Sequence, residues 1–459
     1  MVSRDIVVVG GGPAGYPVAG ILAREGYNVT LIEADKLGGE CTNYGCVPTK
    51  SLLHTALTLA DSKKLGLPYG EFKVRSAFQS ALSTASALSD GIRSVLEKSG
   101  VELVEGYGKV LPSGTVEVDG ERIEAGKGVI LATGSEPFVP RGVKVDGVRI
   151  HDNRSILGWE PGDSQSVIVV GGGYVGVEYS TILSLLGYRV TLIEAMSRLL
   201  PGMDRDFSLL ARRILAKLGV RVVLSSPVSQ VRSESSGVRV LAGDKIFHGD
   251  IALIAIGRRP RNTEALRAGL PVNNRGFVTI GDCWRALGKF YAVGDIAGPP
   301  LLAHKAIHES IGLALCLKGD QFVRGQRPIP QVVYGLVDFV SVGVTLEEAS
   351  RKGVNAVEVR VPAGGLARPR IHGVSDGFAK IVYDEESKRI LGIHLAYPNA
   401  SETAPAALLL VNRHTLSSAL DVVFPHPTFS EVLQEAILAS LGLHAHVSGV
   451  RMRRARKTE

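Results

Sequence analysis

The sequence predicts an α/β protein with two Rossmann-like folds, followed by a C-terminal α+β region. A unit made of an apolar strand, a glycine-rich turn, a helix and a second strand occurs at residues 5–33 and again at residues 166–194. Beyond Pro328 and Pro330, short strands come first and helices follow, a pattern typical of an antiparallel sheet with helices.

Length and composition narrow the class of protein. A chain of 459 residues suggests two to four domains, and 45% hydrophobic with 21% charged residues is ordinary for a globular protein and excludes intrinsic disorder. Glycine is abundant, with 54 residues, and shows no triplet period, so we expect the excess in turns and ligand-binding loops.

The net charge of +7 does not indicate a nucleic-acid partner, because residues 451–459 supply +4 of it. We expect this basic end to be a solvated, mobile tail. The uncharged segment Ile6–Ala23 contains five glycines and two prolines and has no convincing cleavage site, so neither a membrane span nor a signal peptide is predicted. Four cysteines are too few for a disulfide scaffold and indicate a reducing compartment, so we expect a cytoplasmic protein without a membrane partner.

The two glycine-rich turns predict two dinucleotide sites. In each, the first glycine permits a tight turn, the second lets the backbone approach a pyrophosphate, and the third lets the helix pack closely. An acidic residue 23 positions after the first glycine is placed to accept a hydrogen bond from a ribose hydroxyl. These residues are Gly10, Gly12, Gly15 and Glu33 in the first copy, and Gly171, Gly173, Gly176 and Glu194 in the second.

The acidic residue of the second copy favours NAD over NADP. A carboxylate at Glu194 would repel a 2′-phosphate, whereas NADP sites place arginine there. Arg198 follows four residues later and is interpreted as an ordinary surface residue.

The remaining elements follow from periodicity and turn residues. Helices are expected within Leu52–Gly100 and at Ala303–Leu317, and short strands within Val101–Gly134. The C-terminal region is expected to hold strands at Gln331–Val333, Ala356–Val361 and Phe378–Tyr383 and helices at Ser401–Val411 and Ser430–Leu441.

Cys41 and Cys46 form the most informative pair. Along a regular helix the two would be separated by about 7.5 Å, beyond the usual limit of about 7 Å for a disulfide, so a bond requires Thr42–Gly45 to be looped or distorted. A helix beginning near Cys46 would favour a thiolate there.

Two buried cysteines or half of a metal site are the alternatives. No second Cys or His cluster completes a metal site, so no metal is predicted and a redox-active disulfide is favoured. Cys283 and Cys316 have no such context, and Cys316 is expected to be a small core residue.

Taken together, the two dinucleotide folds, the cysteine pair and the terminal α+β region resemble the pyridine nucleotide–disulfide oxidoreductases, and among them most closely the dihydrolipoamide dehydrogenases. The resemblance covers essentially the whole chain. The segments that carry it are Gly10–Gly15, Gly38–Lys50, Ala132–Ser135, Gly171–Glu178, Leu192–Asp204, Ala255–Pro260, Tyr291–Asp295, Leu302–Ala306 and His426–Glu431.

The resemblance implies that the chain is divided into four parts. It also implies two cofactors, with FAD in the first fold and NAD in the second. The parts are an FAD-binding domain at 1–147, an NAD-binding domain at 148–268, a central segment completing the FAD domain at 269–328, and a C-terminal dimerisation domain with the basic tail at 329–459. The further FAD residues would be Lys50, Gly108, Gly134, Asp295, Ala303 and His304. The further NAD-side residues would be Tyr174 as a lid, Glu178 as the partner of Lys50, and Val228 and Gly257 as backbone contacts.

The resemblance also implies a catalytic base. His426, oriented by Glu431, would deprotonate a substrate thiol at the Cys41–Cys46 disulfide of the partner subunit, so a homodimer with shared active sites is expected. The implied reaction oxidises dihydrolipoamide with NAD, the dithiol being a small molecule or carried on a lipoyl domain. Two kinds of alternative remain. One is an activity like that of glutathione reductase or mercuric reductase, and the other is a role chiefly as a docked subunit of a 2-oxoacid dehydrogenase complex.

Two residues depart from the family pattern close to these groups. Glu40 replaces a small hydroxyl residue before Cys41 and adds negative charge there. Phe424 stands where the dehydrogenases often carry another histidine.

Overall fold

The computed structural model of the chain describes residues 2–67, 70, 72–320 and 328–455. Backbone contacts divide the chain into two units. The first contains Met1–Ser164, Val231–Arg239 and Asp250–Gln326, and the second contains Gln165–Gln230, Val240–Gly249 and Arg327–Glu459.

A mixed sheet with a parallel centre forms the middle of the first unit. Its strand order is β17-β18-β6-β1-β2-β3, with β5 beside β6 and β4 beside β5. The strands of this unit are β1 (Val2–Val9), β2 (Val29–Glu33), β3 (Glu102–Glu105), β4 (Lys109–Val110), β5 (Thr115–Val118), β6 (Glu121–Leu131), β7 (Ser135–Pro137), β8 (Ile150–His151), β15 (Ile251–Ile254), β16 (Arg258–Pro260), β17 (Arg285–Leu287) and β18 (Phe290–Ala292). The central strand β1 pairs in parallel with β2 and β6, as the first Rossmann-like fold requires.

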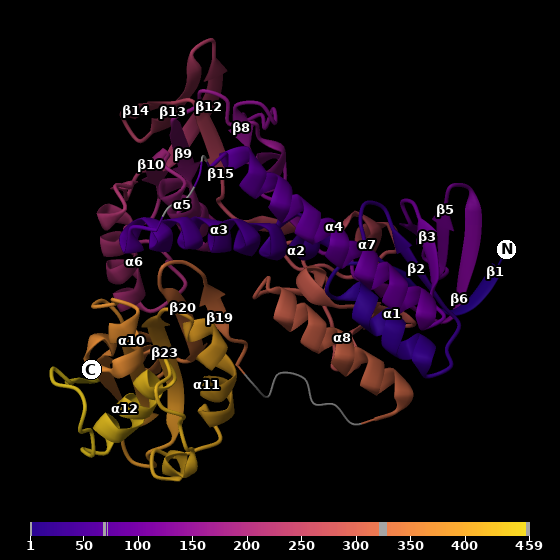
Figure 1. Ribbon diagram of the computed structural model, residues 1–459. Helices are drawn as coiled ribbons and strands as arrows, with labels where there is room; N and C mark the ends of the chain where they lie inside the picture. Colours follow the sequence, from indigo (N-terminus) through magenta and orange to yellow (C-terminus); the bar gives the residue numbers. More distant parts are fainter. Residues whose placement is uncertain (1, 68–69, 71, 321–327, 456–459) are drawn as a thin grey trace. The chain divides into compact units, whose positions relative to one another are not determined.

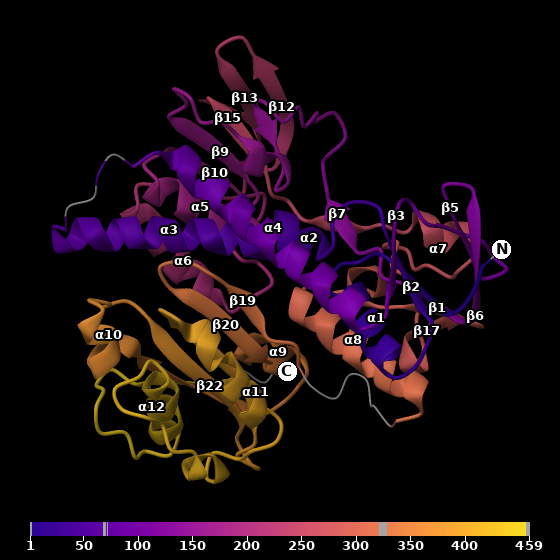
Figure 2. The same ribbon diagram turned by 45° about the vertical axis from the view of Figure 1, so that its right-hand side comes forward.

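The helices of this unit are α1 (Gly15–Arg24), α2 (Gly39–Tyr44), α3 (Cys46–Leu65), α4 (Val74–Lys98), α7 (Thr263–Arg267) and α8 (Ala303–Lys318), with 3-10 turns η1 (Ser155–Gly158), η2 (Asp282–Trp284) and η3 (Gly294–Ala297). Helices α1, α4 and α8 pack on one face of the sheet, and α7 packs on the other. Ile6 and Val8 of β1 face one core cluster, which includes α1 and α8, while Val7 and Val9 face the other. Because both faces are buried here, the second half of β1, Ile6–Val9, is a continuous apolar run rather than an alternating one. Figures 1 and 2 show α1 and α8 side by side.

The second unit contains the repeated fold and the C-terminal sheet. Its elements up to residue 249 are β9 (Ser166–Val170), α5 (Tyr174–Leu185), β10 (Arg189–Ile193), α6 (Arg205–Lys217), β11 (Arg221–Val223) and β14 (Lys245–Gly249). The strands β12 (Val228–Glu234) and β13 (Gly237–Ala242) belong partly to each unit. Strand β10 pairs in parallel with β9 and β11, so the second copy repeats the strand–helix–strand arrangement of the first.

The C-terminal region is an antiparallel sheet with helices, as predicted. Its order is β19-β20-β23-β22-β21-β24. Its elements are β19 (Gln331–Val333), β20 (Asp338–Gly343), α9 (Leu346–Arg351), β21 (Ala356–Pro362), η4 (Ala363–Gly365), α10 (Ala367–Ile371), β22 (Phe378–Asp384), β23 (Ile390–Tyr397), η5 (Ala400–Thr403), α11 (Ala404–Leu410), η6 (Ser418–Asp421), α12 (Glu431–Ser440) and β24 (Arg451–Arg454). Helix α12 packs on β21 and β22 (Figure 2).

A buried ionic cluster ties α6 to this sheet within the second unit. Lys380 on β22 is only 2% exposed, and its Nζ lies 2.9 Å from Asp204, 2.9 Å from Asp206 and 3.2 Å from Glu358. Asp204 is also the N-cap of α6. Lys380 therefore joins the N-terminus of α6 to strand β21. Removing it would leave buried carboxylates without their counter-charge and would be destabilising.

The expectation of a mobile basic tail is wrong for residues 451–454. They form β24, which pairs antiparallel with β21, and Arg454 Nε lies 2.8 Å from Glu385. The chain end gains main-chain hydrogen bonds by extending the sheet, and its arginines are the kind of charged residue that protects a sheet edge. Arg456, Lys457 and Glu459 of the predicted tail lie outside the described residues.

Cys316 packs against the core as expected, but its pairing with Cys283 was not predicted. The two form a second disulfide, with their Cα atoms 5.8 Å apart, that links η2 to α8. Periodicity reveals neither the turn at η2 nor its proximity to the end of α8, because both depend on tertiary packing. Cys283 and Trp284 have φ values of 51° and 54°, a left-handed conformation that costs roughly 1–2 kcal/mol for each residue. The disulfide and the burial of the Trp284 side chain, 1% exposed, hold the turn in this conformation.

Among the described helices, none combines the length and the apolar character that a membrane span requires.

The second disulfide predicts a stability effect. Replacing Cys283 with Ser should lower the melting temperature by roughly 5–10 °C, because the bond closes a loop with a sequence separation of 33 residues. Calorimetry with and without dithiothreitol measures this, and the reductant should shift the wild type further than the variant. Equal melting temperatures for the oxidised wild type and the variant would contradict a stabilising role.

Candidate active site

The two cysteines of the predicted redox pair are joined by a disulfide. The helical conformation is interrupted between them, as a disulfide at this spacing requires. Helix α2 ends at Tyr44, Gly45 adopts a non-helical conformation with φ −131° and ψ −104°, and α3 begins at Cys46. This interruption brings the Cα atoms of Cys41 and Cys46 to 4.8 Å. Cys46 is therefore the first residue of a 20-residue helix, whose free N–H groups favour a negative charge on the sulfur.

The first glycine-rich turn is shaped by close backbone contacts. Gly10 has a φ of +103°, and a Cβ on Gly15 would lie 1.8 Å from the carbonyl oxygen of Gly10, so only glycine fits at the start of α1. The Gly11 N–H donates to Glu33 Oε2 at 2.6 Å, and the Asp35 N–H donates to Glu33 Oε1 at 2.8 Å. The Glu33 carboxylate is thus held at the end of β2, next to the turn.

The second turn repeats this geometry. Gly171 has a φ of +109°, and a Cβ on Gly176 would lie 1.8 Å from the Gly171 carbonyl oxygen. Glu194 accepts from the N–H groups of Gly172 and Met196, as Glu33 does in the first copy. The two copies match in both the glycine contacts and the orientation of the acidic residue.

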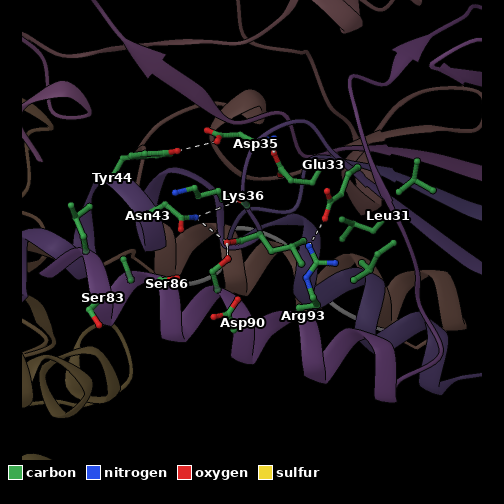
Figure 3. A pocket seen from close by; sticks show the side chains of 17 residues that line it. Leu31, Glu33, Asp35, Lys36, Asn43, Tyr44, Ser83, Ser86, Asp90 and Arg93 are labelled. Carbon is green, nitrogen blue, oxygen red and sulfur yellow. Dashed lines mark hydrogen bonds and ion pairs between the residues drawn. The ribbon is translucent and has the colours of Figure 1, made fainter. Parts of the chain in front are cut away.

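A cavity of about 550 Å³ lies beside Glu33 in the first unit. Figure 3 shows Glu33 and Asp35 on one side of it and Ser86, Asp90 and Arg93 of α4 on another. Its wall combines such polar groups with apolar side chains, a mixture typical of a site for an organic ligand. The cavity and the turn before α1 therefore fit the nucleotide end of a dinucleotide.

Asp295, the predicted flavin carboxylate, is held by a buried network. Ser135 Oγ donates to Asp295 Oδ2 at 2.5 Å. The preceding Gly294 N–H donates to Glu309 Oε2 at 2.9 Å, and Lys305 Nζ donates to the Gly294 and Gly298 carbonyl oxygens at 3.2 and 2.8 Å. Sequence analysis did not assign Ser135, Lys305 or Glu309 to the site, although a charged pair four residues apart in the apolar run Ala303–Leu317 was a signal that could have identified the last two.

The other predicted flavin-side residues belong to the same unit. Ala303 and His304 are the first two residues of α8, and Lys50 lies in the first turns of α3. Gly108 is buried against Val9, Ile32 and Val116. Gly134 has a positive φ of 69° with open space at the Cβ position. Gly257, which was predicted on the NAD side, also lies in the first unit, and it has a φ of 127° with open space at the Cβ position. Their contacts with a cofactor stay predictions.

The second unit holds the predicted nicotinamide residues Tyr174, Glu178 and Val228. Tyr174 begins α5 and donates from its hydroxyl to Gln331 Oε1 at 2.6 Å, and burial raises the pKa of the Tyr174 phenol to about 12. Glu178, 5% exposed, accepts from the Tyr334 N–H at 3.1 Å. Val228 is the first residue of β12. The expected pairing of Glu178 with Lys50 would join the two units and stays a prediction.

The predicted catalytic base has the expected local geometry. His426 Nδ1 lies 2.8 Å from Glu431 Oε1, and the Thr428 N–H donates to Glu431 Oε2 at 2.7 Å. Glu431 begins α12, and its side chain is 14% exposed, whereas that of His426 is 71% exposed. The carboxylate is therefore fixed while the imidazole faces solvent.

Known proteins resemble this chain over nearly its whole length. The model of the pyridine nucleotide-disulphide oxidoreductase family matches residues 4–310, and that family's dimerisation-domain model matches residues 329–437. The chain belongs to the pyridine nucleotide–disulfide oxidoreductase family.

Individual relatives agree with this assignment. The dihydrolipoyl dehydrogenase of Thermus scotoductus is 36% identical over 453 residues, which cover 95% of this chain and 97% of the relative. That of Bacillus subtilis is 33% identical, covering 96% and 99%. Among solved structures, LpdA of Mycobacterium tuberculosis matches with a TM-score of 0.88, and the HOCl-induced flavoprotein disulfide reductase RclA of Escherichia coli, as its Cu(II) complex, with 0.87. Both are 25% identical and cover 96% of this chain and 100% of theirs.

Membership identifies the chain as a flavoprotein disulfide oxidoreductase that uses FAD and NAD. Its own geometry fits both cofactors, because each glycine turn excludes a Cβ by close backbone contact and each has a carboxylate at the end of the following strand. In the second copy Arg198 is already engaged, since its Nη2 donates to the Pro201 carbonyl oxygen at 3.0 Å and its Nη1 lies 3.6 Å from Glu347. These contacts agree with its interpretation as a surface residue.

Gly173 and Gly12 provide a matched test of the two cofactor turns. A Cβ on Gly173 meets no atom within 4 Å, and Gly12 has only the Gly39 Cα at 3.7 Å, so alanine fits both positions. We expect Gly173→Ala to keep the melting temperature and weaken NADH binding at least about tenfold, because the methyl group would occupy the pyrophosphate position. Gly12→Ala should spare NADH binding and weaken FAD binding instead.

Fluorescence titration of NADH and of FAD into each variant measures both constants. Unchanged NADH affinity in Gly173→Ala would contradict the pyrophosphate contact.

Proposed function

We propose that this protein is a dihydrolipoamide dehydrogenase, which oxidises dihydrolipoamide to lipoamide and reduces NAD to NADH. The observation that carries the proposal is the Cys41–Cys46 disulfide at the start of α3, together with the His426–Glu431 pair. The relatives named dihydrolipoyl dehydrogenase, at 33–36% identity, support this substrate over others.

The protein's own residues account for the thiol chemistry. His426 takes a proton from one substrate thiol, and the thiolate attacks Cys41 Sγ, which breaks the Cys41–Cys46 bond and releases Cys46 as a thiolate at the N-terminus of α3. The second substrate thiol then attacks the mixed disulfide, which releases Cys41 and completes the lipoamide disulfide. Two electrons and two protons pass from the dithiol to the protein.

The histidine is oriented for this proton transfer. Because Nδ1 is held by Glu431, Nε2 is the ring nitrogen left to exchange a proton with the substrate. The carboxylate also stabilises the imidazolium that results.

FAD, when bound, would supply the two-electron redox chemistry between the cysteine pair and NAD. We assign Gly10, Gly12, Gly15, Glu33, Lys50, Gly108, Gly134, Asp295, Ala303 and His304 to its site. We assign Gly171, Gly173, Tyr174, Gly176, Glu178, Glu194, Val228 and Gly257 to the NAD side, with Tyr174 as a lid.

We further propose a cytoplasmic homodimer in which His426 of one subunit serves the disulfide of the other, supported by the match of residues 329–437 to a dimerisation domain. The four-part division at residues 147, 268 and 328 belongs to the same proposal. A place in a 2-oxoacid dehydrogenase complex is an alternative role, and co-purification with an acyltransferase core would test it.

The redox pair gives the central prediction. Cys46→Ser should lower dihydrolipoamide turnover by at least about a thousandfold while FAD content stays that of the wild type, since a serine cannot form the disulfide. Cys316→Ser, which opens the other disulfide, serves as the matched control and should retain turnover below its melting temperature.

Steady-state kinetics with dihydrolipoamide, glutathione disulfide and mercuric ion, each with both nicotinamide cofactors, provide the measurement. Undiminished turnover in Cys46→Ser, or activity only on glutathione disulfide with NADPH, would refute the assignment.

The base gives a separate prediction. His426→Gln should reduce kcat for dihydrolipoamide by roughly a hundred- to ten-thousandfold, because general-base catalysis is lost. NADH-driven reduction of an artificial acceptor should persist, since it does not need the thiol step. If both activities fell together, the histidine would act on folding or assembly rather than on the thiol.

A further inference from the structure

Glu40, the residue before Cys41, is held by three side chains of its own unit. Its carboxylate accepts from Asn153 Nδ2 at 2.8 Å, from Arg154 Nε at 2.8 Å and from Arg258 Nη1 at 3.3 Å. Its side chain is 20% exposed. The negative charge that Glu40 adds near the cysteine pair is therefore balanced by two guanidinium groups.

Asn153 and Arg154 hold both ends of the helix that carries Cys41. Asn153 Nδ2 also donates to the Tyr44 carbonyl oxygen at 3.0 Å, at the last residue of α2. The Arg154 guanidinium lies 4.1 Å from the centre of the Tyr44 ring and 3.2 Å from Asp35. A helix of six residues has little stability of its own, so these contacts decide where Cys41 is placed.

The electrostatics of Arg154 agree with this arrangement. Burial would lower the pKa of Arg154, but Glu40, Asp35 and Tyr44, with Glu40 first among them, together outweigh this effect and raise the pKa above its ordinary value. A partly buried arginine of this kind depends on its carboxylate partner.

Arg258 continues the path toward the flavin side. Its Nε donates to Ser135 Oγ at 2.8 Å, its Nη2 donates to the Ser135 carbonyl oxygen at 2.8 Å, and Ser135 Oγ donates to Asp295 Oδ2 at 2.5 Å. The antiparallel pairing of β7 with β16 sets this register, because Pro260 lies opposite Ser135 and Arg258 opposite Pro137.

We propose that Glu40 is a positioning residue that couples the helix of Cys41 to Asp295 through Arg258 and Ser135. The inference rests on the proposed function, which assigns Asp295 to the flavin. Glu40 holds one side of the Arg258 guanidinium, and the other side orients the Ser135 hydroxyl toward Asp295. Loss of the carboxylate removes the counter-charge of Arg258, which is itself a member of the path to Asp295, and it releases α2 at its N-terminal end.

The test uses the holoenzyme with Glu40→Gln, which keeps an oxygen acceptor for Asn153 but removes the charge that pairs with the arginines. We expect the FAD dissociation constant to rise about tenfold, as for loss of one charge-assisted hydrogen bond of about 1.4 kcal/mol. FAD rebinding to the stripped protein, followed by flavin fluorescence, measures it. With dihydrolipoamide, kcat should fall while KM is unchanged, because Glu40 places Cys41 and does not bind substrate.

Glu136→Gln is the matched control. Glu136 is the neighbour of Ser135 on β7, and its carboxylate lies 2.6 Å from Arg259 and 3.6 Å from Arg261 in a more exposed setting. Within the described part of the chain, no hydrogen bond joins the side chains of this surface cluster to Asp295, and its loss should leave FAD affinity at the wild-type value.

A double variant tests the path itself. If Glu40 acts through Ser135, Glu40→Gln combined with Ser135→Ala should weaken FAD binding no more than the stronger single variant. Arg258→Gln interrupts the same path, and its FAD dissociation constant provides a second measurement if Glu40→Gln yields little protein.

Wild-type FAD affinity in Glu40→Gln and Arg258→Gln, or additive effects in the double variant, would overturn the inference. A wild type that binds FAD but does not turn over dihydrolipoamide would instead overturn the proposed function, and the FAD measurements would still decide the role of Glu40.

Discussion

The close approach of a helix to the strand before it is the constraint on which both nucleotide folds depend. In each copy a Cβ at the third glycine would lie 1.8 Å from the carbonyl oxygen of the first. Only glycine allows this contact, which sets the N-terminus of α1 or α5 directly over the end of its strand. The carboxylates of Glu33 and Glu194 are then fixed by N–H groups of the same turns. One local geometry, used twice, therefore shapes both dinucleotide turns of this flavoprotein disulfide oxidoreductase.

The redox centre depends on a second local constraint, the interruption of a helix at Gly45. The break allows Cys41 and Cys46 to approach and makes Cys46 the first residue of α3. The short helix α2 that carries Cys41 receives its support from residues more than a hundred positions away, through Asn153 and Arg154. The disulfide thus forms between residues that are close in sequence, whereas the position of the helix that carries Cys41 depends on residues far away in the chain.

Much of the fold and of the candidate site could be predicted because their signals are local. The apolar strands, the two glycine turns and the position of α3 follow from residue spacing, and the His426–Glu431 contact lies within six consecutive residues. Cys283 and Cys316 could not be paired in this way, since a turn and a helix end meet only after packing. Residues 451–454 are exposed, as their charge indicates, but they were expected to be mobile, because the free edge of β21 with which they pair is not visible in the sequence.

The sequence by itself determined the class of the protein, its two dinucleotide turns, its cysteine pair and the predicted base, because each depends on residues close together along the chain. Only the tertiary structure decided how charges are compensated across that chain. Glu40 reads as an added negative charge in the sequence, yet Arg154 and Arg258 pair with it, and Ser135 connects it to Asp295. Electrostatic balance and long-range disulfides depend on distances in space, which sequence separation does not specify.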